Sequence, residues 1–126
     1  MKKILILAIV FAGLRLLTLE TGFAQNQRFN SAPNWANTPN QSVFTGQLLK
    51  FTVYASDPDG DGLTYSAVSL PSGATFNQVS QTFTWRPSSG QTGNYTPIFR
   101  VYDGVNSVDT DVLIIVTSST NPSPPV

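Results

Sequence analysis

The sequence of 126 residues contains no cysteine and no histidine. Without cysteine the chain can have no disulfide framework, no Cys-ligated zinc site and no cysteine nucleophile. Without histidine it cannot carry a catalytic triad that uses a histidine base. These absences leave carboxylate chemistry and ion binding as the main candidates for function.

Charge is also scarce, because charged residues make up 11% of the chain and an average soluble domain has about 25%. Seven basic and seven acidic residues give a formal charge of zero. A nucleic-acid-binding protein needs a basic stripe, so no nucleic-acid partner is expected. No glutamate follows Glu20, and a glycosidase needs two well-separated carboxylates, so we predict a protein that is not an enzyme.

The N-terminus has the layout of a secretory signal peptide. Basic Lys2 and Lys3 precede the apolar run Ile4–Leu14, and Gly22-Phe23-Ala24 places small residues before a cut at Gln25. We therefore predict a signal peptide over residues 1–24 and a secreted or cell-surface protein. The run is too short to span a bilayer, so no stable membrane span is expected in the mature chain. The alternatives are an uncleaved anchor or a buried helix.

Composition divides the remaining chain into three parts. Residues 25–40 are rich in Asn, Ser, Ala and Pro, which is typical of a lead-in linker. Residues 118–126 form a Pro/Ser-rich tail that cannot pack. Residues 41–117 are left as the folded domain. After the predicted cut, four basic residues face six aspartates, so the mature chain carries a formal charge of −2.

Several short segments between residues 49 and 116 alternate apolar and polar residues, as half-buried strands do. Gly, Pro, Asp and Asn occupy the connections, and no stretch has a helical period. Strands at this spacing indicate an all-β sandwich. Tyr95 is expected to tie a corner of the sandwich through its hydroxyl. The predicted core is Leu49, Phe51, Val53, Leu63, Tyr65, Phe76, Phe83, Trp85, Tyr95, Phe99, Val101, Ile114 and Val116.

Five linked motifs carry a family resemblance: the runs 46–66 and 70–77, Phe83-Thr84-Trp85-Arg86-Pro87, Gly93-Asn94-Tyr95 and Val101-Tyr102-Asp103-Gly104. In this order they resemble the cadherin-like repeats of the dystroglycan type, also called putative immunoglobulin-like repeats, of exported bacterial proteins. The resemblance covers residues 30–117. It implies a seven-stranded immunoglobulin-like (cadherin-like) β-sandwich whose repeats stack end to end.

The same resemblance implies a calcium site, because calcium lies at the junctions between repeats in true cadherins. Asp57 and Asp59 match the paired acids of the second-to-third strand loop, Asp103 matches the acid after the sixth strand, and Asn30 matches the asparagine that opens the lead-in. The Asp-Arg-Glu motif of true cadherins is absent, and residues 85–88 occupy its region. No preceding repeat is expected, since a signal peptide comes first.

The chemistry of one loop also favours a cation. Asp57, Asp59 and Asp61 alternate with Pro58 and Gly60, and calcium takes six to eight oxygen ligands from flexible loops of this kind. Magnesium fits less well because it demands octahedral geometry. The alternative is a plain turn, since Asp, Pro and Gly are turn residues. The predicted ligands of a calcium cofactor are Asp57, Asp59, Asp61, Asp103 and Asn30.

Three functions fit these observations. The first is a non-enzymatic extracellular module that acts in adhesion or as a spacer and contacts other cadherin-like repeats, surface proteins or glycans. The second is a carbohydrate-binding or accessory module of a secreted hydrolase system, with outward Trp35, Tyr54 and Tyr102 stacking on sugar rings. The third is a piece of a longer repeat array, because residues 121–126 resemble the lead-in of a following repeat.

Overall fold

The computed structural model describes residues 28–120, so the predicted signal peptide and residues 121–126 lie outside the described part. The chain divides into the units Met1–Asn30 and Ser31–Val126, and the fold reported below is that of the second unit. Within residues 28–120, no helix is long and apolar enough to cross a membrane.

The described residues form eleven short strands. Six of them form three pairs, each interrupted by two residues: β3 with β4, β8 with β9, and β10 with β11. β1 and β2 form the first strand of the sandwich in two pieces, which gives seven strands in all. The bounds are β1 Asn34–Trp35, β2 Gln41–Phe44, β3 Leu49–Thr52, β4 Ala55–Ser56, β5 Thr64–Ser69, β6 Thr75–Asn77, β7 Thr82–Trp85, β8 Gly93–Tyr95, β9 Ile98–Tyr102, β10 Ser107–Asp111 and β11 Ile114–Thr117.

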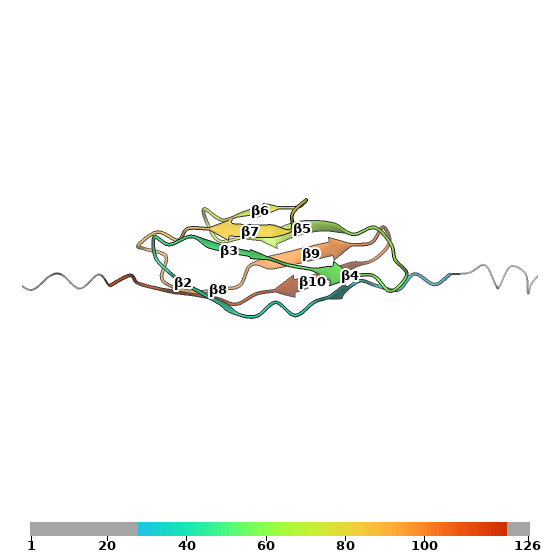
Figure 1. Cartoon of the computed structure of the whole chain (residues 1–126), viewed down its shortest axis with the longest axis horizontal. Coiled ribbons are helices and arrows are strands. Elements are labelled where there is room, and N and C mark those ends of the chain that lie inside the picture. The colour runs from blue at the N-terminus through green and yellow to red at the C-terminus, as the bar shows by residue number, and fades with distance from the viewer. Residues whose placement is uncertain (1–27, 121–126) are drawn as a thin grey trace, which may run out of the picture. The chain divides into compact units, whose positions relative to one another are not determined.

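The strands form two layers, and Phe99 of one layer packs against Phe51 and Phe83 of the other. Figure 1 shows the two layers one over the other. One layer contains β1 paired with β4 and the order β3-β7-β6. The other contains the orders β10-β9-β5 and β2-β11-β8, in which β2 runs parallel to β11. The chain changes layers between β1 and β2, so its first strand completes both sheets. The prediction of an all-β, immunoglobulin-like sandwich of seven strands is confirmed.

The core lies between the two layers, where stacked Phe51 and Phe83 meet Phe99 from the opposite sheet edge-on. Most of the predicted core is confirmed. Phe51, Leu63, Phe76 and Tyr95 are only half-buried. The prediction omitted Val43 and Val112, which the structure buries. The buried apolar residues are Val43, Leu49, Val53, Tyr65, Phe83, Trp85, Phe99, Val101, Val112, Ile114 and Val116.

The hydroxyl tie belongs to Tyr65 and not to Tyr95. The Tyr65 hydroxyl accepts the Ala55 N–H at 3.0 Å and donates to the Ala55 carbonyl at 3.2 Å. One side chain of β5 thereby satisfies both backbone groups of a residue in β4. The ring of Tyr95 instead packs against Trp85, with ring centroids 4.8 Å apart.

Tyr65→Phe tests this tie. The ring stays in place, but the substitution removes a donor and an acceptor from Ala55, so we expect the free energy of unfolding to fall by about 1–2 kcal/mol. Urea unfolding measures the loss. Tyr54→Phe is the matched control, because the Tyr54 ring is 56% exposed, and it should leave stability unchanged. Equal losses in the two variants would contradict a structural role for the Tyr65 hydroxyl.

Candidate functional site

The loop between β4 and β5 carries the acidic cluster predicted from the sequence. Asp57, Asp59 and Asp61 each offer one carboxylate oxygen, and these three atoms lie within 4.8 Å of one another. Two oxygen ligands of one calcium ion can be at most about 5 Å apart, which is twice the calcium–oxygen distance. The three carboxylates can therefore share one cation.

Asp57 organises the loop. Its Oδ1 accepts the N–H groups of Asp59 at 2.8 Å and Asp61 at 3.2 Å, and the Gly60 N–H donates to the Asp57 carbonyl at 3.2 Å. Gly60 has a φ of 81°, a left-handed conformation that suits glycine at the tip of the turn. These bonds hold the loop in a tight curl without using the second oxygen of Asp57.

That second oxygen, Asp57 Oδ2, is buried and has no hydrogen-bond partner among the described residues. A buried carboxylate oxygen without a donor lowers the stability of the fold, because it gives up hydrogen bonds to water and forms none within the protein. A bound cation would remove this cost. The residues present therefore fit a hard cation by geometry and by unmet electrostatic need.

The lead-in also contacts this loop, since the Ser31 N–H donates to Asp59 Oδ2 at 2.6 Å. Asn30, the fifth predicted ligand, belongs to the first unit of the chain. Its part in a calcium site stays a prediction.

Asp103 lies in the turn between β9 and β10. Figure 1 shows that β4 and β9 end on the same side of the sandwich, so both loops lie at one end. However, the side chain of Asp103 is buried, and its Oδ1 accepts the N–H groups of Val105 at 2.7 Å and Asn106 at 2.6 Å. Asp103 is not in the group formed by Asp57, Asp59 and Asp61. Its carboxylate shapes the β9–β10 turn.

The three aromatic residues predicted to face outward differ in exposure. Tyr54 and Tyr102 are 56% and 42% exposed. The prediction is wrong for Trp35, which is half-buried. Its ring meets Tyr65 edge-on at 5.8 Å, and its indole N–H donates to the Val108 carbonyl at 3.1 Å. Trp35 therefore joins β1 to the opposite layer and offers no platform for a sugar ring.

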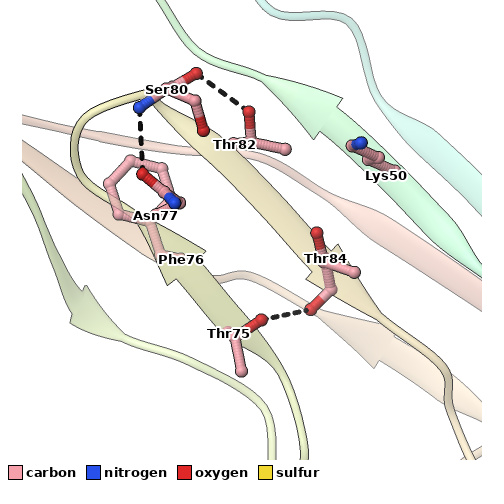
Figure 2. A pocket seen from close by; sticks show the side chains of 7 residues that line it. All are labelled: Lys50, Thr75, Phe76, Asn77, Ser80, Thr82 and Thr84. Atoms are coloured by element: carbon pink, nitrogen blue, oxygen red, sulfur yellow. Dashed lines mark hydrogen bonds between the residues drawn. The ribbon is translucent and has the colours of Figure 1, made fainter.

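The outer face of the β3-β7-β6 sheet carries a second feature that sequence reasoning missed. A groove of 540 Å³ crosses it, and six of its seven lining residues carry a hydroxyl, amide or ammonium group (Figure 2). The polar residues that alternate with apolar ones along each strand are visible in the sequence. The sequence does not show that β6 pairs with β7, which brings these polar residues together on one face. The lining residues are Lys50, Thr75, Phe76, Asn77, Ser80, Thr82 and Thr84.

An ion pair marks the outer face of the other sheet. The Arg100 guanidinium contacts Asp109 in bidentate fashion, with bonds of 2.7 and 2.8 Å. These hydrogen bonds hold the pKa of Asp109 below its usual value and raise the pKa of Arg100. Both side chains are exposed, so solvent screens the pair and its effect on stability is small.

Comparison with known proteins places this geometry in a family. The sequence model of the Putative Ig domain family matches residues 32–119 of the chain. No curated protein matches the chain in sequence.

Several solved structures share the fold. An endo-fucoidan hydrolase of glycoside hydrolase family 107 superposes with a TM-score of 0.60 at 23% identity, over 75% of this chain and 15% of its own. A second hydrolase of that family superposes with a TM-score of 0.56 at 28% identity, over 73% of this chain and 18% of its own. A structure of human protocadherin-24 superposes with a TM-score of 0.56 at 19% identity, over 69% of this chain and 45% of its own. The chain thus spans less than half the length of each of these proteins.

Proposed function

The chain belongs to the Putative Ig domain family, and on that premise we propose that it is a non-enzymatic extracellular module that binds calcium. It acts in adhesion or as a structural spacer. Its partners are other cadherin-like repeats, surface proteins or glycans. The finer kinship to the dystroglycan type is part of this proposal and rests on the linked motifs at residues 46–66 and 101–104.

The buried Oδ2 of Asp57 is the observation that supports calcium most directly. It lies in a loop whose three carboxylates converge within 4.8 Å, and no donor satisfies it among residues 28–120. Calcium accepts flexible arrangements of carboxylate and carbonyl oxygens, whereas magnesium requires a near-octahedral shell. The loop offers carboxylates and turn carbonyls without such a shell, which favours calcium.

Three carboxylates supply only part of a calcium shell of six to eight oxygens. Asp103 and Asn30 are proposed as further ligands, with water in the remaining positions. Asp103 would then share its carboxylate between the ion and the turn that it holds at 2.6–2.7 Å. Because so many ligands are water, we expect a dissociation constant of about 10⁻⁴–10⁻³ M, as in other extracellular modules.

Calcium should therefore stabilise the domain measurably. At about 10 mM calcium and a dissociation constant of about 1 mM, mass action contributes about 1.4 kcal/mol, which should raise Tm by roughly 5–10 °C. Asp59→Asn should remove most of this rise, because it weakens the cluster without deleting the Asp57 turn. Thermal melts with calcium, magnesium and EDTA measure the effect.

The matched control is Asp111→Asn, which makes the same change in charge at an exposed position of β10. It should keep the full calcium response. An unchanged wild-type melt in calcium would show that the loop is only a turn. Equal loss in Asp59→Asn and Asp111→Asn would show that calcium acts through net charge rather than through the loop.

A second candidate is a carbohydrate-binding or accessory module of a secreted hydrolase system. Its support is that two endo-fucoidan hydrolases contain a part with this fold, one at 28% identity over 18% of its length. Of the aromatic residues first considered, Tyr54 and Tyr102 remain as exposed platforms. A glycan array distinguishes this candidate from a plain spacer, which should bind no glycan.

The proposed layout places the signal peptide at residues 1–24, the lead-in at 25–40, the sandwich domain at 41–117 and the tail at 118–126. The lead-in contains the short strand β1, which pairs with β4. Secretion or display at the cell surface follows from this layout. Sequencing the N-terminus of the exported protein should find Gln25 first, and a retained Met1 in a membrane fraction would mean an anchor instead.

A further inference from the structure

The outer side of the β3-β7-β6 sheet is a regular polar surface, here called the polar face. Strand register places Lys50, Thr84 and Thr75 in one row across the three strands. The next row contains Thr52, Thr82 and Asn77. The groove of 540 Å³, which is open to solvent, follows these rows.

The polar face is basic, although the domain as a whole is acidic. Lys50 is exposed on β3, and Arg86 follows β7 at an exposed position, two residues after the half-buried Thr84. No aspartate lies on β3, β6 or β7. The opposite sheet instead carries Asp109 and Asp111 beside a single arginine, Arg100. The charges are therefore sorted between the two sheets, and an anionic ligand would find its complement on the polar face.

The hydrogen-bonding groups of the polar face are fixed in place. Asn77 Oδ1 accepts the N–H groups of Val79 at 2.9 Å and Ser80 at 3.0 Å, which leaves its NH₂ group as the donor available to a ligand (Figure 2). The Thr75 hydroxyl donates to the Thr84 carbonyl at 3.4 Å, so its oxygen can still accept. Arg86 uses one of its five donors on the Gly46 carbonyl.

We propose that the polar face binds an anionic polysaccharide. Lys50 and Arg86 would contact its sulfate or carboxylate groups, while Asn77 and the hydroxyls of Thr75 and Thr84 would contact its ring hydroxyls. Rows of hydroxyl and amide groups suit a ligand that is itself rich in hydroxyls. Phe76 lines the groove and packs against Phe99, with centroids 5.0 Å apart. No second aromatic ring lines the groove, whereas single-stranded nucleic acid stacks successive bases on several aromatic side chains. The inference rests on the carbohydrate-binding candidate above and names its site and ligand class.

Binding of the full-length protein to dextran sulfate at about 50 mM salt, where exposed charges are little screened, tests the proposal. Lys50→Gln should weaken binding about fivefold, as for an exposed charge contact, and the double variant with Arg86→Gln should weaken it further. Arg100→Gln is the matched control, because it removes the same charge from the other sheet, and its affinity should change less than about twofold. Polygalacturonate in place of dextran sulfate distinguishes carboxylate from sulfate recognition.

Each alternative outcome overturns a defined part of the proposal. If dextran sulfate binds but Lys50→Gln loses no more affinity than Arg100→Gln, the polar face is not the site, although the carbohydrate-binding candidate stands. If neither polysaccharide binds, both fall. If polyglutamate binds as tightly as dextran sulfate, or neutral dextran does, the ligand class is wrong.

Discussion

Trp85→Ala should lower the free energy of unfolding by about 3–5 kcal/mol, as for other large aromatic truncations in a core. The indole is 1% exposed. It meets Phe83 edge-on at 6.5 Å and Tyr95 at 4.8 Å. Alanine would leave a cavity between the two sheets that the surrounding strands cannot fill, since β7 is the central strand of its sheet.

The penalty should come from packing rather than from the indole hydrogen bond. The Trp85 N–H donates to the Ser72 carbonyl at 3.1 Å, but that carbonyl also accepts from Gln91 Nε2 at 3.0 Å. It therefore keeps a partner when the indole is removed. Trp85→Phe, which loses the same N–H but keeps a ring, should cost less than Trp85→Ala.

Urea unfolding at constant m-value measures these losses. Lys50→Ala is the control on the same sheet, because its side chain is exposed, and it should stay within about 0.5 kcal/mol of the wild type. A loss below about 1 kcal/mol for Trp85→Ala would contradict the inward position of the indole.

The strands that the sequence predicts correctly are those with enough residues to alternate. β9 buries every second residue, Phe99 and Val101, and β7 buries Phe83 and Trp85 together with Thr82. In such segments the alternation of apolar and polar residues is enough to predict which face is buried, without knowledge of the neighbouring strands. Core prediction therefore succeeds along these strands.

The short strands β2 and β6 depend on pairing with another strand. β2 buries only Val43 and exists because it runs parallel to β11, about seventy residues later in the chain. β6 contributes one apolar residue, Phe76, and is held by β7. Two to four residues are too few to show a period, so pairing with another strand decides their structure.

The candidate site divides in the same way. Asp57, Asp59 and Asp61 converge because they belong to one turn, and a local spacing in the sequence is enough to predict that. Asp103 comes from another loop, and its side-chain direction is decided by the β9–β10 turn. A turn-capping aspartate two and three residues before the N–H groups that it accepts is itself a sequence signal. The polar face requires three strands in register, which no single segment predicts.

Asp103→Ala is the second substitution for which we expect a large effect, a loss of about 2–4 kcal/mol in EDTA. The carboxylate is 7% exposed and accepts two short backbone hydrogen bonds, from Val105 and Asn106. Hydrogen bonds to a charged group each contribute about 1.5–3 kcal/mol, and alanine would leave both N–H groups without this acceptor.

Asp103→Asn separates the turn from the ion. Its amide oxygen can still accept from Val105 and Asn106, so in EDTA it should cost less than Asp103→Ala. If Asp103 also binds calcium, Asn should nevertheless reduce the rise in Tm that calcium produces. Asp111→Ala, at an exposed position, should change stability by no more than about 0.5 kcal/mol. A loss in EDTA no larger for Asp103→Ala than for Asp111→Ala would contradict the turn-holding role. A full calcium response in Asp103→Asn would restrict the ion site to the loop of Asp57, Asp59 and Asp61.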